Sequence, residues 1–348
     1  MFTLLIVLVS LAALGWLYER WARARDRRNF AAPGRMIDVG GHRLHVRSAG
    51  EGDLAVVFEG DEGAWSTHWG RLPEDVSSVT HSVAYDRAGL GWSETGPPPR
   101  DAETVARELH QLLARVAPGV PVVLVGHGTA AHSLRAYAHR YPFETAGIVL
   151  VDPLHDGFID RLQREQLPTA TPSPALMRIW SICASFGLVR LLRTGRSTNA
   201  ALRVTERQRA TLDALELDPR VRRGAADEIV AEAASLDYLG RLNESTDIPV
   251  RVITSTETLT GTELPADFPV SDYNRIWIEE SERFLEISKR AERLLVEGSG
   301  HQLQLERPEV VLEAILDIID EARRLRAESE EEAAAAPMGA QLAVEERT

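Results

Sequence analysis

The segment from Val120 to Tyr141 constrains the fold of this chain more than any other feature. An apolar run, Val120 to Val125, leads into the sequence GHGTA at residues 126–130, and helical apolar spacing follows from Ala131 to Tyr141. A buried strand, a sharp turn between small residues and a helix, in this order, predict a nucleophile elbow whose central residue is usually serine. Here the central residue is Gly128, so the turn is present without the expected nucleophile.

Strand-like and helix-like segments alternate along most of the chain. Gly40 and Gly41 form a hairpin turn signal between the first two predicted strands. The pattern predicts an α/β fold with a mostly parallel central sheet and helices on both faces. Strands are predicted at Met36–Val39, Leu44–Val46, Leu54–Phe58, Ser82–Tyr85, Val120–Val125, Ile148–Val151, Val250–Ile253 and Leu294–Val296, and helices at Ala102–Val116, Ala131–Tyr141, Arg275–Lys289 and Glu309–Ala322.

The alternation is interrupted between residues 155 and 247, where the pattern indicates helices and no strand. Because ligands of open α/β sheets bind at the carboxyl ends of the strands, we interpret 155–247 as a helical lid. The sheet domain would then comprise residues 35–154 and 248–325. Ala175 to Leu192 is unusually apolar for a surface helix; packing on the sheet domain is favoured over a pocket wall or a second membrane contact.

The N-terminal residues 1–21 predict a transmembrane anchor. Phe2 to Leu17 is almost wholly apolar, and aromatic residues follow it at the position of a membrane interface. Positive charge lies only after the apolar run, at Arg20 and then in a basic linker at residues 22–34, whereas a cleaved signal peptide carries it before. By the positive-inside rule we expect a single-pass protein of the cell membrane, with the folded domain in the cytoplasm.

The overall charge and the cysteine content exclude some function classes. The formal net charge of -13 argues against a phosphate-binding surface, so nucleic acid is not an expected partner. A single cysteine, Cys183, cannot form an internal disulfide, and no Cys/His spacing suits zinc. We expect no cofactor and no metal. The charge-rich segment at residues 326–348 predicts a disordered acidic tail.

Five motifs in order resemble the α/β-hydrolase family, in particular its bacterial members with an N-terminal apolar segment. The motifs are Ile37–His45, Tyr85–Ser93, the elbow at residues 126–130, Leu150–Pro153 and Val296–His301. The resemblance covers about residues 34–323 and implies an α/β-hydrolase fold with a lid. In this family a serine attacks an acyl carbon, a histidine accepts its proton, and a carboxylate orients the histidine.

The resemblance also implies where the catalytic groups should lie. His301 matches the base, while Glu257 and Asp152 are both candidates for the acid. Gly128 is a vacant nucleophile position, because glycine cannot form a covalent intermediate. Thr129 lies next to it in the oxyanion region.

The loop after Leu54–Phe58 departs from the family pattern as well. Relatives carry an uncharged glycine-rich loop there, whereas this chain has Asp61 and Glu62 in the oxyanion region. If these carboxylates face inward, they oppose the stabilisation of a developing oxyanion. The alternative is that both point into solvent.

These observations lead to two functional hypotheses. The first is a membrane-anchored pseudo-hydrolase without serine hydrolase activity, which binds a small apolar or acyl-bearing molecule or a partner. The second is an enzyme in which His301, with Glu257 or Asp152, acts as a general base without a covalent nucleophile.

Overall fold

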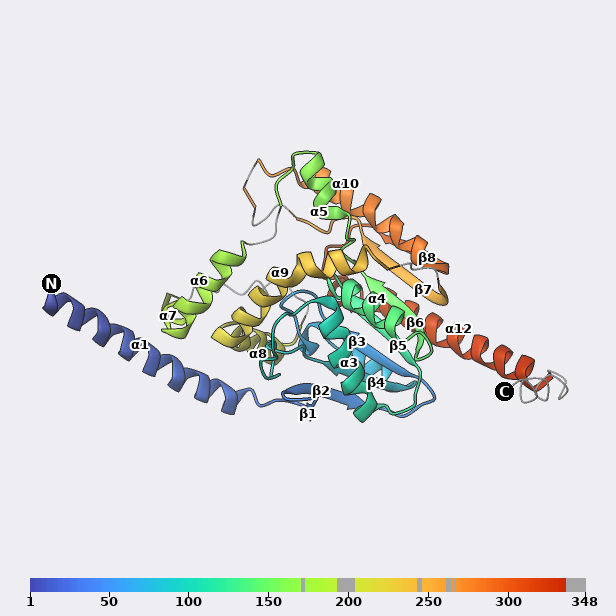
Figure 1. Ribbon diagram of the computed structural model, residues 1–348, viewed down its shortest axis with the longest axis horizontal. Coiled ribbons are helices and arrows are strands. Elements are labelled where there is room, and N and C mark those ends of the chain that lie inside the picture. The colour runs from blue at the N-terminus through green and yellow to red at the C-terminus, as the bar shows by residue number, and fades with distance from the viewer. Residues whose placement is uncertain (170–172, 193–203, 243–245, 261–263, 266, 336–348) are drawn as a thin grey trace, which may run out of the picture.

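A computed structural model describes residues 1–335, apart from 170–172, 193–203, 243–245, 261–263 and 266. Its centre is an eight-stranded sheet with the strand order β1-β2-β4-β3-β5-β6-β7-β8 (Figure 1). The strands are β1 (Arg35–Asp38), β2 (Arg43–Ala49), β3 (Ala55–Glu59), β4 (His81–Tyr85), β5 (Val122–His127), β6 (Thr145–Val151), β7 (Thr246–Ser255) and β8 (Ser288–Val296).

The direction of the strands places the site. Strand β2 runs antiparallel to β1 and β4, whereas β3 to β8 pair in parallel. The predicted α/β-hydrolase sheet is therefore confirmed. The carboxyl ends of β3, β5, β6, β7 and β8 lie along one edge, so the loops that follow them can bring side chains together.

Helices cover both faces of this sheet, and β5 shows why. Leu124 packs into the cluster that includes α3 and α4, whereas Val123 and Val125 point to the opposite face, toward α2 and α12. Successive side chains of a strand point to opposite faces, so an all-apolar strand is suited to burial between two helical layers. The helices of the sheet domain are α2 (Leu72–Val76), α3 (Ala102–Val116), α4 (Ala130–Arg140), α10 (Val270–Ser281), α11 (Leu303–Glu306) and α12 (Pro308–Ala335), with 3₁₀ turns η1 (Ser66–Trp69) and η4 (Glu282–Ile287).

The segment before β8 differs from the prediction. A helix was expected from Arg275 to Lys289, but α10 ends at Ser281, the 3₁₀ turn η4 follows, and β8 begins at Ser288. Strand β8 is an edge strand that pairs only with β7, and several of its polar side chains are exposed. Because an edge strand needs little apolar sequence, its first half lacked the signal of a buried strand.

The insertion between β6 and β7 is helical where the structure describes it. Helix α9 packs against α3, α4 and α6, so this layer lies over the sheet domain on the side of the elbow (Figure 1). The helices are α5 (Phe158–Arg164), α6 (Pro174–Ser185), α7 (Leu188–Leu192), α8 (Glu206–Glu216) and α9 (Pro219–Leu239).

Both ends of the described chain are more helical than expected. Helix α1 (Phe2–Asn29) continues through most of the predicted linker at 22–34, since no Gly or Pro occurs between Gly15 and Pro33. Helix α12 runs to Ala335, although disorder was predicted from 326. Its extension is rich in Ala, Glu and Arg, which favour helices, and Arg326 pairs with Glu330 at 2.9 Å. Residues 336–348 of the predicted tail lie outside the described residues.

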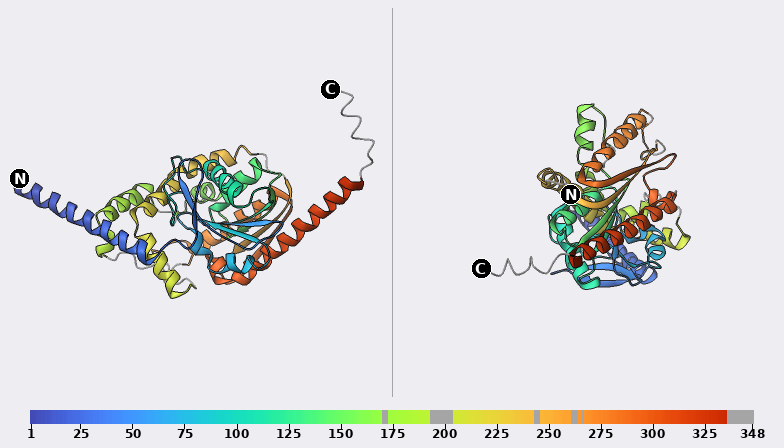
Figure 2. Two further views of the ribbon diagram at one scale, coloured as in Figure 1. Left: turned by 90° about the horizontal axis from the view of Figure 1, so that it is seen from below. Right: turned by 90° about the vertical axis from the view of Figure 1, so that its right-hand side faces the viewer.

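Helix α1 and the end of α12 project from opposite ends of the body (Figure 2). Helix α1 is long and apolar enough to cross a membrane, a property that signal sequences share. The apolar residues at its N-terminal end are exposed.

Candidate functional site

The elbow adopts the geometry that the sequence predicts. Strand β5 ends at His127, Gly128 has φ = 56°, and α4 begins at Ala130. The N–H of Gly128 donates to the carbonyl of Val151 on the neighbouring strand (3.1 Å). Glycine adopts this left-handed conformation without the steric cost that other residues incur.

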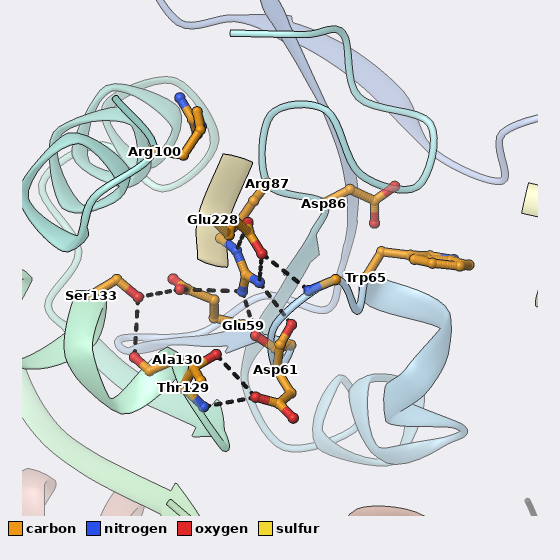
Figure 3. A network of polar contacts seen from close by, with 12 residues as sticks. Glu59, Asp61, Trp65, Asp86, Arg87, Arg100, Thr129, Ala130, Ser133 and Glu228 are labelled. Atoms are coloured by element: carbon orange, nitrogen blue, oxygen red, sulfur yellow. Dashed lines mark hydrogen bonds and ion pairs between the residues drawn. The ribbon is translucent and has the colours of Figure 1, made fainter. Parts of the chain in front are cut away.

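The space beside Gly128 is occupied by a carboxylate. A Cβ placed on Gly128 would overlap the side chain of Asp61, which comes from the loop after β3. The Oδ1 of Asp61 accepts hydrogen bonds from the backbone N–H of Thr129 (2.8 Å) and from its hydroxyl (3.0 Å; Figure 3). A carboxylate therefore lies where the side chain of an elbow nucleophile would begin. The backbone N–H of Thr129, which belongs to the oxyanion region, donates to this carboxylate.

His301 links this carboxylate to a second one. It lies after β8 and directly before α11, with Nε2 2.9 Å from Oδ2 of Asp61 and Nδ1 2.7 Å from Oδ2 of Asp152. The side chains of His301 and Asp61 are 25% and 21% exposed, so a small molecule can reach both. The three residues form a continuous array that we call the Asp61–His301–Asp152 triad.

The charges of the triad are mutually stabilising. Burial would lower the pKa of His301, but its hydrogen bonds to Asp152 and Asp61 and their charges outweigh this and raise the pKa to about 10. Burial would raise the pKa of Asp61, but the hydrogen bond and charge of His301 hold it well below its usual range. At neutral pH an imidazolium therefore lies between two carboxylates, and Nε2 has no free lone pair with which to accept a proton.

The structure distinguishes between the two acid candidates by position. Asp152 follows β6 and is fully buried, and its Oδ1 accepts hydrogen bonds from the Ser255 N–H (2.8 Å) and from Trp277 Nε1 (3.0 Å). Glu257 is exposed, and its backbone N–H donates to the carbonyl of Ser299 (3.0 Å). Of the two acid candidates, the one whose carboxylate contacts His301 is therefore Asp152.

A buried network holds the loop that carries Asp61. The guanidinium of Arg87 donates to the backbone carbonyls of Gly60 and Asp61, the latter at 2.7 Å, and to Glu228 on helix α9 (2.7 Å; Figure 3). The fully buried Glu59 accepts hydrogen bonds from Tyr85 (2.5 Å) and from Ser133. Arg87 therefore joins the Asp61 loop to helix α9 of the insertion between β6 and β7.

Glu62 behaves in the opposite way to its neighbour Asp61. It lines a cavity of about 50 Å³ between the loop, α4 and α9. Burial, together with the negative charges of Asp61, Glu228 and Glu232, raises the pKa of Glu62 to about 9. Glu62 is thus held as a neutral acid at neutral pH, and the two adjacent acidic residues contribute one charge to this region.

One group of side chains has metal-ligating atoms close together. Single ligand atoms of Asp61, His127 and His301 lie within 4.8 Å of one another. However, His127 Nε2 is 2.8 Å from the carbonyl of His301, and the side-chain nitrogen of Gln304 lies 3.4 Å from Nδ1. Because His301 holds a proton between two carboxylates and both nitrogens of His127 have partners, the geometry favours a proton over a metal ion here.

Sequence reasoning found part of this site. It placed Asp61, Glu62 and Thr129 near the oxyanion region, and the alternative that both carboxylates point into solvent does not apply to Asp61. It did not find Glu59, Arg87 or Glu228. A signal for Glu59 was present, since a charged residue at the end of a buried apolar strand needs a partner.

A family model, described as the alpha/beta hydrolase family, matches residues 60–314, which include the Asp61 loop, the elbow and His301. The chain belongs to the α/β-hydrolase family. The match covers more than half of the sequence and includes the strands from β4 to β8, the elbow and the helical insertion between β6 and β7.

Individual relatives of this α/β-hydrolase are distant. The chain is 28% identical over 156 residues to the uncharacterized protein YbdG of Bacillus subtilis, covering 42% of this chain and 48% of that protein. It is 29% identical over 118 residues to 2-(acetamidomethylene)succinate hydrolase of Mesorhizobium japonicum, covering 34% and 42%. The alignments thus span half or less of these curated relatives.

Solved structures show the same fold over most of the chain. The epoxide hydrolase CorEH has a TM-score of 0.58 at 18% identity, with coverage of 82% of this chain and 98% of that one. An esterase from Thermogutta terrifontis has a TM-score of 0.58 at 18% identity, with coverage of 83% and 99%. At this identity the likeness concerns the fold.

Proposed function

We propose that this chain is a membrane-anchored pseudo-hydrolase: an α/β-hydrolase-fold protein without serine hydrolase activity that acts by binding a small apolar or acyl-bearing molecule, or a protein partner. The observation that carries the proposal is the position of Asp61. Its carboxylate fills the space beside Gly128 and accepts the Thr129 N–H, so both the nucleophile position and an oxyanion donor are occupied.

The protonation of His301 supports the same conclusion. Serine chemistry requires a neutral imidazole that accepts the proton of the nucleophile. His301 instead carries a proton at neutral pH, because two carboxylates flank it. The same argument weakens the hypothesis of a general base without a covalent nucleophile, since His301 would become a base only near pH 10.

The experiment uses the full chain in lipid nanodiscs, with a fluorophosphonate probe and short-chain esters. We expect no labelling and no ester turnover. The variant Asp61→Gly/Gly128→Ser serves as the positive control, because it removes the carboxylate and supplies a hydroxyl. Labelling of any residue of the unmodified chain would contradict the proposal.

A second candidate function follows from the partial exposure of the triad. In it, Asp61 Oδ2 attacks an electrophilic sp³ carbon such as that of an epoxide, forming an ester while the ring C–O bond breaks. The imidazolium of His301 donates its proton to the departing alkoxide. The now neutral His301, facing an uncharged ester, then accepts a proton from the water that attacks the ester carbonyl, and Asp61 is regenerated with release of a diol.

A trapping experiment separates the two functions. In the His301→Gln variant, solvent water has to protonate the alkoxide, which slows the first step, but no base remains to activate water for the second step, so an ester formed on Asp61 would accumulate. After incubation with styrene oxide, mass spectrometry of the peptide that contains Asp61 measures the adduct, with Asp61→Asn as the control. No adduct at Asp61 is expected for a pseudo-hydrolase, whereas an adduct at Asp61 alone would replace that proposal with the second candidate.

The membrane part of the proposal rests on α1. Its apolar residues are exposed, and basic residues lie only on its C-terminal side, which supports a single-pass anchor with the folded domain in the cytoplasm. The test is protease protection in intact spheroplasts, in which a cytoplasmic domain survives external protease. Digestion of the domain before lysis would show that it lies outside the cell, which contradicts the proposed orientation.

A further inference from the structure

The lid exposes an apolar surface that is not explained by the fold. Packing of Ala175–Leu192 on the sheet domain was expected, but only part of the segment is buried, such as Val189 at 2% exposure, and eight large apolar residues of α6, α7 and the turn between them are between 37% and 71% exposed. We call this surface the lid face; it consists of Leu176, Ile179, Trp180, Ile182, Phe186, Leu188, Leu191 and Leu192. Apart from α1, no other segment of the described chain gathers so many exposed apolar side chains. Such a patch on a soluble surface marks a contact with something apolar.

The lid face lies directly beside the predicted membrane anchor. Helix α1 contacts α6, and Figure 1 shows α1 passing close to α6 and α7. Gly15 of α1 lies against the backbone carbonyl of Phe186, where a Cβ would collide. A Cβ on Gly187 would likewise lie too close to the ring of Tyr18. Two glycines at the crossing allow the backbones to approach, as in helix pairs within membranes.

A buried ion cluster fixes this contact. Arg190 of α7 donates to Glu19 (3.0 Å) and to Asp26 (2.7 Å), both on α1, and Glu19 is fully buried. Arg23 lies 3.9 Å from Asp218, which precedes α9. Helix α1 and the lid are therefore held in one orientation relative to each other, rather than joined by a tether.

The position along α1 at which the α6–α7 turn makes contact indicates the level of this turn relative to the membrane. The apolar run of α1 ends at Leu17, and the turn between α6 and α7 meets α1 at Gly15 and Tyr18. On the same stretch, Arg20 lies over the ring of Trp16 at 4.7 Å. Tryptophan with arginine marks the headgroup level of a bilayer. The α6–α7 turn is thus at the level of the membrane interface.

We propose that the lid face inserts into the interfacial layer of the same bilayer that α1 spans, so that the lid is a membrane-embedded element. The proposal rests on the membrane anchoring of α1. The occupant of the lid face is lipid, because the face is continuous with the apolar surface of α1. The charged residues of α6 and α7 are compatible with lipid. They are Arg178 and Arg190, and each pairs with an acidic residue, on α9 and on α1 respectively.

The inserted lid is connected to the candidate site. Helix α6 packs on α9, and Glu228 of α9 binds Arg87, which in turn holds the backbone of Asp61. A shift of the lid relative to the bilayer would therefore act on the loop that fills the elbow. Any apolar ligand of the pseudo-hydrolase would then reach the lid from the lipid phase.

The test measures the depth of single labels in vesicles that hold the full chain. The sole cysteine, Cys183, is replaced by serine, and cysteines are introduced singly for labelling with the fluorophore NBD. Ile182 and Leu191 report on the lid face. Leu8 on α1 is the positive control. Phe143 is the negative control, since it is fully exposed and precedes β6 at the amino ends of the parallel strands.

The measured quantity is quenching by phosphatidylcholine brominated along its acyl chains, in vesicles that also contain phosphatidylglycerol. We expect the labels at Ile182 and Leu191 to lose at least half as much fluorescence as the label at Leu8, and the label at Phe143 to be unaffected. If the lid labels behave like Phe143 while Leu8 is quenched, the lid face is in water and the proposal is wrong. If Leu8 itself is not quenched, the membrane anchoring is wrong.

Coverage of the lid face by protein gives a third, distinct result. A second copy of the chain would shift the emission of the Ile182 label to the blue without quenching by brominated lipid, and this would overturn the proposal. The variant Ile179→Asp provides an independent check, because charge opposes insertion; it should at least halve the quenching at Leu191. Val230→Asp, at a similarly exposed apolar residue of α9, should leave that quenching unchanged.

Discussion

The carboxyl edge of the sheet and the lid face differ in how the protein covers side chains that are placed at an energetic cost. At the carboxyl edge, charged groups that are costly to bury have partners inside the protein: His301 lies between Asp61 and Asp152, and Arg87 lies between Glu59 and Glu228. On the lid face, apolar side chains that are costly to expose are only partly covered by the described chain. The charged groups of the candidate site are therefore compensated within the protein, whereas the apolar side chains of the lid face are not.

The largest expected effect concerns the elbow. Gly128→Ser alone should not restore ester hydrolysis, because its Cβ would overlap the side chain of Asp61. Asp61→Gly/Gly128→Ser removes the overlap and one of the carboxylates that keep His301 protonated. We expect short-chain ester turnover at least about 100-fold above either single variant, since a positioned nucleophile and base supply several orders of magnitude. Equal activity of Gly128→Ser and the double variant would show that Asp61 does not fill the site.

The second prediction tests the lid. Arg190→Met leaves the buried Glu19 without its main partner, which costs about 2–4 kcal/mol locally. Hydrogen exchange should then increase in α7 and in residues 15–29 of α1, while α3 and the sheet are unaffected. In Glu19→Met/Arg190→Met neither charge remains, so protection should largely return. Failure of the double variant to recover would mean that the ion cluster does not hold the lid.

The third prediction concerns pH and the triad. The pKa of His301 is raised from 6.5 to about 10 in the folded protein, so its stabilising contribution is complete below about pH 6.5 and is lost as the pH rises toward 10. The free energy of unfolding should fall by up to about 1.4 kcal/mol per pH unit between pH 7 and 9. In His301→Gln this part of the slope should disappear. Denaturant titrations at several pH values measure it, and identical slopes would contradict the assigned charge state.

The smallest effect is expected at Glu62. Its folded-state pKa of about 9 lies above the ordinary value of 4.5, so the acid costs stability progressively as the pH rises above 4.5. Glu62→Gln keeps the shape of the neutral acid and should stabilise the protein by about 1 kcal/mol at pH 8 and not at pH 4. Glu94→Gln is the matched control; the pKa of Glu94 is lowered by Arg43, so its loss should not stabilise. A destabilised Glu62→Gln at pH 8 would indicate that Glu62 is ionised.

The sheet and the elbow were predictable because burial imposes a local pattern. Strands such as β3 and β5 lie between two helical layers, so each residue of the run had to be apolar. The first half of β8 was not predicted as a strand, because an edge strand borders solvent and can therefore carry polar residues. The extent of α1 and α12 was underestimated, since charge was interpreted as a sign of linkers although Arg, Glu and Ala are strong helix formers.

The candidate site was only partly predictable, for a different reason. Asp152 and Glu257 both follow strands whose carboxyl ends lie at the same edge, so the sequence left the choice between them open. Only the contacts distinguish them: Asp152 is buried against Ser255, Trp277 and His301, whereas Glu257 faces solvent.

The sequence by itself determined the turn at residues 126–130 and the absence of a nucleophilic atom at Gly128, because both depend on the chemistry of consecutive residues. Only the tertiary structure decided what occupies that position. Asp61 reaches it from another strand, since a carboxylate there satisfies the Thr129 N–H and pairs with the charge of His301, while the missing Cβ leaves room for it. Such compensation joins residues far apart in the chain, and no local pattern records it.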